Sequence, residues 1–347
     1  MKKSKVSIKT IAANLNISVT TVSFVLNGKA KEKHISKELT QKVLDYAKEV
    51  NYKPNQIAQS LRTGKSNLLV FMVEDLSNSF FSKLARIIED IAYEKGYKVI
   101  FCSNENDDEK SNDLISLFKF RQVDGFIIVP SPGIKNTIKE LIDENIPVVL
   151  LDRNFEDLEC NSVIIDNEEA TYNATSHLID NGFKKIGFIT TNSDQSQMKG
   201  RLSGYEKAVF EHNLETKVLQ IPYNDIHKGK SKDYVNKFLE QHADIDAAFF
   251  ATNYLAQTGL EVFKENKPNL IYDLGIIAFD DNEMFKIYDP SITSVSQPLV
   301  EISTKLMEIL LPLLKKKDVS ESISKVILKT DLIIRESSLK KNSLIVS

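Results

Sequence analysis

The chain has 347 residues and a formal net charge of −3, which is long enough for two or three domains with separate hydrophobic cores. Its two cysteines, Cys102 and Cys160, are too few for a disulfide framework and favour a reducing cytoplasmic setting. We see neither an apolar signal core nor an apolar run of transmembrane length, so the sequence predicts a cytoplasmic protein with no membrane partner.

Charge is distributed unevenly along the chain. Residues 1–65 hold 13 Lys and Arg against 4 Asp and Glu, whereas residues 66–347 hold 32 against 44. A basic segment at one end of an acidic chain indicates that this end binds a polyanion such as nucleic acid.

The segment from Ser7 to Asn27 predicts two short helices joined by a turn at Asn16 and Ile17. Apolar residues recur at helical spacing in both halves, at Ile8, Ile11, Ala12 and Leu15 and then at Val22, Val25 and Leu26. Ser18 is a good N-cap for the second helix because its hydroxyl can accept an orphan backbone N–H. The opposite face of that helix carries uncharged groups, at Thr20, Ser23, Phe24 and Asn27. Such a face is typical of a helix that enters the major groove of DNA, although a plain helical hairpin is the alternative.

A third helix is predicted after Ser36, which can cap it, and its apolar stripe is formed by Leu39, Val43, Leu44, Ala47 and Val50. Residues 54–65 follow as a linker in which Pro54 suits a first helical turn and Ile57 and Leu61 lie one turn apart. A helix of about two turns is marginal in isolation. We therefore expect the linker to become helical only when something holds it, which is a physical basis for a switch.

From Leu68 onward, short apolar strands alternate with amphipathic helices. The predicted strands are 69–73, 99–102, 126–129, 148–151, 163–165, 186–189, 218–221, 247–250 and 274–278. This βαβ alternation predicts doubly wound parallel sheet, and about ten strands exceed one comfortable sheet, so we expect two subdomains.

Several motifs make the chain resemble the lactose-repressor/galactose-repressor (LacI/GalR) family of bacterial transcription regulators. They are SIKTIAANLNISVTTVSFVLNG at the head, NYKPNQIAQSLRTGKSN in the linker, and then NSFF, KGY, VDGFIIVPS, IPVVLLDR, GRLSGY, IIAFDD and ITSVSQP, in the order of that family. The resemblance covers essentially the whole chain, and the pairing of head and linker motifs is specific.

The resemblance implies an all-α helix-turn-helix head at 1–53, a hinge helix at 54–65 and an α/β core at 66–347. The core would have two doubly wound parallel-sheet subdomains of the periplasmic-binding-protein type. The first would comprise about 66–166 and 291–330, and the second about 167–290 and 331–347. A helix at 298–314 would return to the first subdomain.

The resemblance also implies residues that bind DNA. Base contacts fall on Val19, Thr20 and Phe24, and phosphate contacts on Thr21, Ser23, Asn27 and His34. Phe24 departs from the family, which often has Arg there, so its direct readout would be apolar; the alternative is that it folds back onto Ala30 or the third helix. In the hinge, Leu61 matches a leucine wedged between base steps in the minor groove; the alternative is that it packs against the core. Its neighbours at the DNA would be Asn55, Ala58 and Arg62.

Candidate effector-binding residues follow strands, because ligands of such sheets bind outside the carboxyl ends of the strands. Arg201 in GRLSGY and Asp280 in IIAFDD are implied as the main polar anchors, although they could instead pair with each other. The other candidates are Phe80, Phe81, Asp152, Gln195, Gln197, Tyr223 and Asn253; Arg153 also follows the fourth strand. The family usually has Asp where Asn253 lies, which hints at a ligand that is more acidic or less hydroxylated than a plain sugar.

The sequence thus predicts a homodimeric operator-binding regulator, a repressor by analogy, controlled by a small-molecule effector such as a sugar or sugar derivative. An enzyme or a sugar-binding protein on the same scaffold is the alternative. We find no GxGxxG, GxxxxGK[ST] or GxSxG motif, and the five histidines are scattered. The sequence therefore predicts no catalytic residues, no metal and no cofactor.

Overall fold

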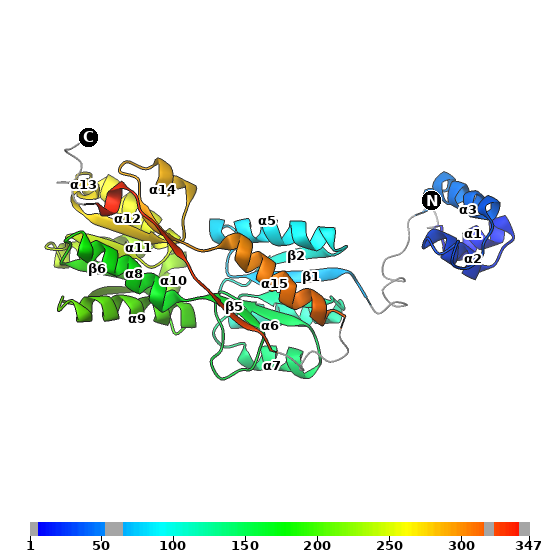
Figure 1. Cartoon of the computed structure of the whole chain (residues 1–347), viewed down its shortest axis with the longest axis horizontal. Coiled ribbons are helices and arrows are strands. Elements are labelled where there is room, and N and C mark those ends of the chain that lie inside the picture. The colour runs from blue at the N-terminus through cyan, green and yellow to red at the C-terminus, as the bar shows by residue number, and fades with distance from the viewer. Residues whose placement is uncertain (1–5, 53–64, 316–322, 340–347) are drawn as a thin grey trace. The chain divides into compact units, whose positions relative to one another are not determined.

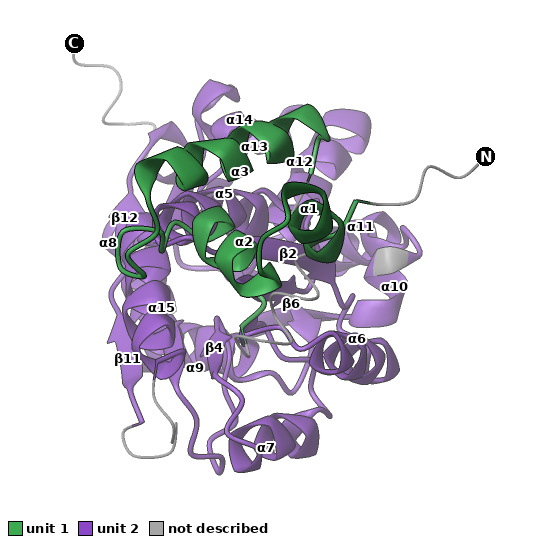
Figure 2. Ribbon diagram, turned by 90° about the vertical axis from the view of Figure 1, so that its right-hand side faces the viewer, with its two compact units in different colours: residues 1–66 green, residues 67–347 purple. Residues whose placement is uncertain are grey.

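The computed structural model describes residues 6–52, 65–315 and 323–339, apart from the His227 side chain. The chain divides into two compact units, Met1–Ser66 and Asn67–Ser347 (Figure 2). We refer to them as the head and the core, and describe each by itself.

The described part of the head is a three-helix domain, formed by α1 (Ile8–Leu15), α2 (Val19–Leu26) and α3 (Lys37–Glu49). A serine caps each helix, as the sequence predicts for the second and third: Ser7, Ser18 and Ser36 accept the N–H groups of Thr10, Thr21 and Leu39. Asn16 makes the turn after α1 in the left-handed conformation, at φ 53°. The buried centre consists of Ile11, Ala12, Val22, Val25, Val43 and Ala47. Leu44 is 42% exposed, so its predicted place in the α3 stripe is wrong; it lies about 100° around the helix from Val43, which packs inward.

The first subdomain of the core is a six-stranded parallel sheet in the order β11-β5-β4-β3-β1-β2. Its strands are β1 (Leu68–Val73), β2 (Lys98–Ser103), β3 (Gly125–Ile128), β4 (Val148–Leu151), β5 (Ser162–Ile165) and β11 (Lys325–Leu328). Its helices are α5 (Ser79–Glu94), α6 (Asp108–Phe120), α7 (Lys135–Asp143) and α15 (Leu299–Leu313). The helix α15 packs against α5, so the chain does return to this subdomain (Figure 1).

The second subdomain is a six-stranded sheet in the order β12-β10-β9-β8-β6-β7, in which only β12 is antiparallel. Its strands are β6 (Ile186–Asn192), β7 (Lys217–Pro222), β8 (Ala247–Phe250), β9 (Gly275–Phe279), β10 (Thr293–Ser296) and β12 (Asp331–Ile333). Its helical segments are α8 (Asn167–Asp180), α9 (Ser196–Glu211), α10 (Tyr223–His227), α11 (Ser231–Gln241), α12 (Asn253–Asn266), α13 (Leu270–Asp273), α14 (Glu283–Ile287) and the 3-10 turn η1 (Glu336–Ser338).

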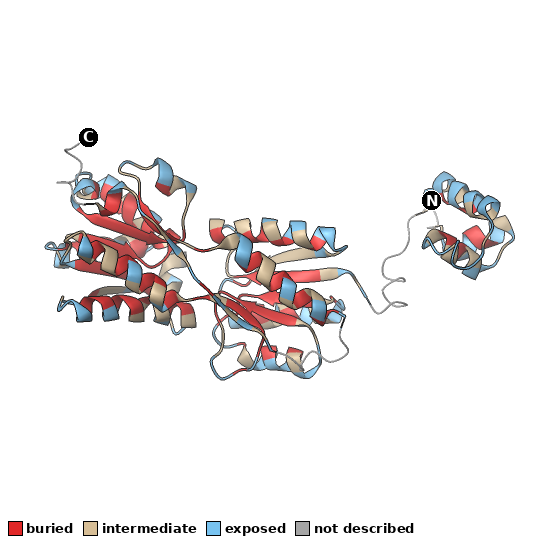
Figure 3. Cartoon of the chain, in the orientation of Figure 1, coloured by how far each residue is buried: buried red, intermediate tan, exposed pale blue. Residues whose placement is uncertain are grey.

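Apolar side chains cover both faces of each sheet, as a doubly wound fold requires. Figure 3 shows that buried residues are concentrated on the strands of the core. The fold class predicted from the sequence, a helical head with two doubly wound subdomains, is confirmed. Among the described residues, no single helix is long and apolar enough to cross a membrane, and only the bent pair α1 and α2 passes that test when the two are taken together.

The chain crosses between the subdomains three times, after β5, after β10 and after β11. The expected start of the second stretch of the first subdomain, at residue 291, is wrong, because β10 still belongs to the second sheet and Thr293 pairs with Ile277 of β9. The sequence did not predict this strand because two of its three buried positions, Thr293 and Ser294, carry hydroxyls. The structure satisfies them by hydrogen bonds from Thr293 to the Arg335 carbonyl (3.0 Å) and from Ser294 to Asp281 (2.6 Å).

Candidate DNA-reading face and ligand pocket

The outward face of α2 is open to solvent where the sequence predicts base contacts. Val19 is 44% exposed, Thr20 and Asn27 are exposed, and Thr21, Ser23 and Phe24 are half-buried. His34 is exposed in the loop before α3, at φ 52°. These side chains are therefore accessible to solvent on one helix and in the loop that follows it, and we refer to them together as the α2 surface.

Part of this surface is already engaged in local interactions. The Thr21 hydroxyl lies 2.8 Å from that of Ser18, and the Asn27 amide donates to the Ser23 carbonyl at 2.6 Å. The Phe24 ring lies under the Lys33 ammonium, 5.6 Å from the ring centre, within the range of a cation–π contact. Phe24 is thus neither fully exposed nor part of the buried centre of the head.

The predicted hinge residues Asn55, Ala58, Leu61 and Arg62 lie outside the described residues.

A polar pocket opens where the carboxyl ends of strands from both subdomains of the core meet. It is lined by Glu74, Asn78, Phe80, Phe81, Asp152, Arg153, Gln195, Gln197, Met198, Arg201, Thr252, Tyr254 and Asp280, and we call it the intersubdomain pocket. Seven of the nine effector candidates are therefore brought together, and the other two lie beside the pocket. Its free space is about 40 Å³. That is room for a few water molecules, far below the roughly 300–1,000 Å³ of pockets that enclose drug-sized ligands.

On the side of the first subdomain, the pocket is organised around the buried Arg153, the second residue after β4. Its guanidinium donates to Glu74 Oε2 (2.6 Å) and Asn106 Oδ1 (2.6 Å), and its Nε lies 3.4 Å from Asp152 Oδ2. Burial disfavours the charge of Arg153, but the carboxylates of Glu74 and Asp152 outweigh burial and hold its pKa above the ordinary value. This guanidinium is therefore a permanent cation with its own counterions.

On the side of the second subdomain, Arg201 is held by α8, β8 and β9. It donates to Asn167 Oδ1 (2.8 Å) and to the Ala251 carbonyl (2.7 Å), and it stacks 3.6 Å above the Phe279 ring. Its Nη1 lies 4.0 Å from the Asp280 carboxylate. The two anchors do contact each other, but at the limit of an ion pair.

Asp280 is buried and accepts a hydrogen bond of 2.6 Å from the Gln297 amide. Burial raises the pKa of this carboxyl, although the Arg201 charge and the Gln297 hydrogen bond oppose the rise. The Asp280 carboxylate can therefore accept hydrogen bonds from the hydroxyl groups of a ligand.

Tyr223 and Asn253 do not line the pocket but tie its two sides together. The Tyr223 hydroxyl donates to Glu74 Oε1 at 2.8 Å, and burial together with the Glu74 charge raises the pKa of Tyr223. The Asn253 amide donates to Asn78 Oδ1 at 2.8 Å, and Asn78 donates back at 3.3 Å. Gln195 likewise donates to Asn106 at 3.0 Å across the same gap.

Sequence reasoning missed Glu74, Asn78, Met198, Thr252 and Tyr254 as lining residues. The available signal was position alone, because Glu74 follows β1 directly and Thr252 follows β8, just as the predicted residues follow their strands. Arg153 carries the same signal, since it lies two residues after β4.

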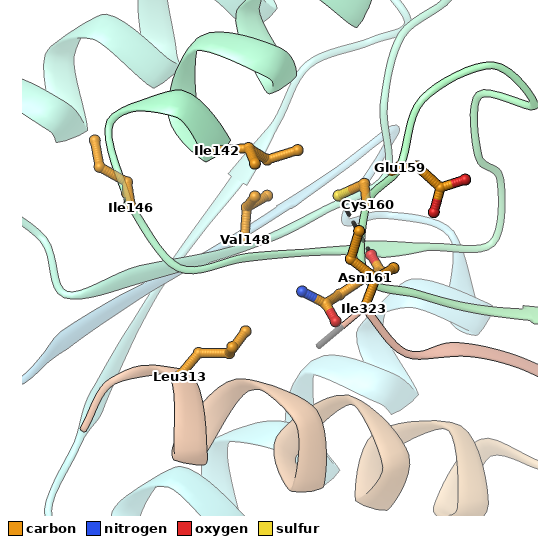
Figure 4. A pocket seen from close by; sticks show the side chains of 8 residues that line it. All are labelled: Ile142, Ile146, Val148, Glu159, Cys160, Asn161, Leu313 and Ile323. Carbon is orange, nitrogen blue, oxygen red and sulfur yellow. Dashed lines mark hydrogen bonds between the residues drawn. The ribbon is translucent and has the colours of Figure 1, made fainter. Parts of the chain in front are cut away.

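A second cavity lies in the first subdomain, and Figure 4 shows the side chains that line it. They are mostly apolar: Ile142, Ile146, Val148, Glu159, Cys160, Asn161, Leu313 and Ile323. Burial raises the pKa of the Cys160 thiol to about 12, so it is not a thiolate nucleophile at neutral pH. Among the described residues, no group of three or more His, Cys, Asp and Glu is arranged to hold a metal ion.

Comparison with known proteins gives matches over both units. Residues 7–55 match the family model of bacterial regulatory proteins, lacI family, and residues 66–334 match that of periplasmic binding proteins and the sugar binding domain of the LacI family. The chain is 33% identical to the HTH-type transcriptional regulator RegA of Clostridium saccharobutylicum, over 96% of this chain and 99% of the relative.

It is also 30% identical to the ribose operon repressor of Halalkalibacterium halodurans, over 96% of this chain and 97% of that protein. Among solved structures, the lac repressor dimer bound to operator and the anti-inducer ONPF superposes with a TM-score of 0.82. Its identity is 21%, over 96% of this chain and 99% of that one, which shows a shared fold.

Proposed function

The chain belongs to the LacI family of bacterial regulatory proteins, and on this premise we propose that it is a transcriptional repressor whose binding to operator DNA is controlled by a small molecule in the intersubdomain pocket. The effector is a sugar or a sugar derivative. The relatives named above are transcriptional regulators rather than enzymes.

The composition of the pocket is the observation that supports this proposal most directly. Arg201 presents donors and Asp280 presents acceptors 4.0 Å apart, and Phe80 and Phe81 form an apolar wall beside them. Adjacent donors, acceptors and rings suit the hydroxyls and the apolar face of a sugar. We assign Arg201 and Asp280 as anchors, Phe80 and Phe81 as stacking residues, and Asp152, Gln195 and Gln197 as further polar contacts.

Operator recognition is assigned to α2 and the loop that follows it. Val19, Thr20 and Phe24 would contact bases, and the remaining polar groups of the surface, Thr21, Ser23, Asn27 and His34, would contact phosphates. The excess of basic residues in 1–65 predicts that the affinity for DNA falls steeply with salt, because bound phosphates release counterions.

We further propose that the protein works as a homodimer in the cytoplasm, with one head on each operator half-site. Residues 54–65 would couple the core to the head, a proposal that rests on their sequence motif, in which Leu61 is the wedge residue. The ligand must bind two states of the core with different affinity, since otherwise it shifts nothing. The small free space of the pocket supports such a difference, because a sugar can enter only if the two subdomains part.

Selection of bound DNA from a random pool by the purified full-length protein tests this function. We expect enrichment of a pseudo-palindromic sequence, and its release or tighter retention in the presence of one member of a panel of sugars, sugar phosphates and purines. Failure to enrich any sequence at low salt, with or without the panel, would contradict the proposal.

A further inference from the structure

Glu74 is a carboxylate whose two oxygens contact different subdomains. It follows β1 in the first subdomain, its Oε2 accepts from Arg153 at 2.6 Å, and its Oε1 accepts from the Tyr223 hydroxyl of the second subdomain at 2.8 Å. Its side chain is only 13% exposed. The residue therefore neutralises a buried cation and also joins the two sides of the pocket.

The charges that line the pocket leave no cation in excess. Glu74, Asp152 and Asp280 supply three carboxylates against the two guanidinium groups of Arg153 and Arg201, and neither Lys nor His lines it. Arg153 faces two of those carboxylates, and Arg201 has Asp280 beside two neutral acceptors. An anionic ligand would meet a net negative lining whose cations already have partners.

Helix N-termini normally attract anions, and α5, α9 and α12 all begin at this pocket. The start of α9 at Gln195 has no side-chain cap, whereas the first turns of α5 and α12 are capped from within the chain. The Phe80 N–H donates to Asn78 Oδ1 at 3.0 Å, and the Leu255 N–H donates to Thr252 Oγ1 at 3.3 Å. These two helix starts thus offer fewer bare N–H groups to a phosphate than their position suggests.

We propose that Glu74 makes the intersubdomain pocket selective for uncharged, hydroxyl-rich ligands and against phosphorylated or carboxylated ones. This is opposite to the more acidic ligand that the sequence hints at through Asn253, a residue that does not line the pocket. The inference rests on the proposed function of the pocket as the effector site. A phosphate that takes the Nη2 edge of Arg153 must displace Glu74, and the displaced carboxylate would stay buried without its counterion, which is strongly unfavourable. Hydroxyl groups can insert between Glu74 and its partners while both charges keep a hydrogen bond.

Two nearly isosteric variants separate the charge of Glu74 from its bridging role. Glu74→Gln removes the negative charge and keeps groups that can hydrogen-bond to Arg153 and Tyr223. Tyr223→Phe is the matched control, because it removes the bridging hydroxyl and leaves every charge in place. Circular dichroism and thermal melting of each full-length variant report whether the fold is preserved.

The probes are ribose with ribose 5-phosphate, glucose with glucose 6-phosphate, and inorganic phosphate, titrated by calorimetry at constant ionic strength. In the unmodified protein, we expect no phosphorylated member of a pair to bind more tightly than its neutral partner, and only weak binding of inorganic phosphate in the core. Removal of one charge beside Arg153 in Glu74→Gln should raise the affinity for phosphate and for the sugar phosphates about tenfold. Tyr223→Phe should show no such gain.

The unmodified protein, Glu74→Gln and Tyr223→Phe share the same basic head. Any phosphate that binds to the head therefore contributes equally to all three titrations, and differences between them report on the core. Tighter binding of a sugar phosphate than of its neutral sugar by the unmodified protein overturns the inference. Equal phosphate affinity in the unmodified protein and in Glu74→Gln overturns it as well. Either result leaves operator selection intact, so failure of this inference and failure of the proposed function give different outcomes.

Discussion

The head and the core place their proposed functional side chains in opposite environments. In the described part of the head, the residues of α2 and the following loop that are assigned to DNA are exposed or half-buried, and packing depends on six other residues at its centre. In the core, the assigned anchors Arg201 and Asp280 are themselves buried and bonded to the surrounding framework. Recognition should therefore be separable from stability in the head, whereas the two should be coupled in the core.

Loss of head packing is expected to have the largest effect. Ile11→Ala removes a fully buried side chain from a small centre, which costs about 2–5 kcal/mol and exceeds what a domain of this size can readily lose. Gel-shift titration should show operator affinity reduced more than about a hundredfold, while the effector still binds. Leu44→Ala, at an exposed position of the same domain, should change neither; equal loss in both variants would argue against the packing explanation.

The second-largest effect is expected from removal of the Arg201 guanidinium, which tests the assignment of the effector site in the core. Arg201→Ala leaves Asp280 and Asn167 without their partner, so we expect effector affinity to fall about a hundredfold and the core to melt at a lower temperature. Operator binding without effector should persist. Lys207→Ala, on the exposed side of the same helix, is the control. An unchanged effector titration in Arg201→Ala would remove this residue from the site.

A surface substitution in α2 should have a smaller effect, confined to recognition. Phe24→Ala deletes a half-buried ring outside the buried centre, so specific operator affinity should fall roughly five- to tenfold through lost apolar contact. The melting temperature of the head should change little. Lys33→Ala tests whether the contribution comes from the ring or from the ammonium above it. A large drop in melting temperature for Phe24→Ala would make the ring structural.

The smallest expected effect is a pH dependence in the second subdomain. Burial lowers the pKa of His177, whose Nε2 lies 2.8 Å from the Ser338 hydroxyl. The unfolded chain then binds the proton more readily than the folded chain, so this contribution to stability is present above the ordinary histidine pKa and is lost as pH falls below it. Urea unfolding of the full-length protein between pH 7.5 and 5.5, compared with that of His177→Gln, should show a steeper loss for histidine. Parallel curves would contradict this role.

The comparison of head and core also explains which expectations came from sequence. Helix starts in the head follow from a local rule, a serine cap one residue before the first helical residue, and Ser18 and Ser36 obey it. The prediction that Leu44 is buried was wrong because the spacing of apolar residues does not show how wide the buried face of a helix is. The strand β10 was not predicted because its buried hydroxyls are satisfied by partners near residue 335, about forty residues further along the chain.

By itself, the sequence determined the two-unit organisation, the doubly wound class and most residues that follow strands into the pocket, because periodicity, capping and strand ends are local properties. Only the tertiary structure decided that Arg153 is shared by Glu74 and Asp152, that Asn253 pairs with Asn78, and that Tyr223 reaches Glu74. These partners are separated by up to 175 residues along the chain. Burial makes each ionic partner matter more, and no local pattern records which distant residue supplies it.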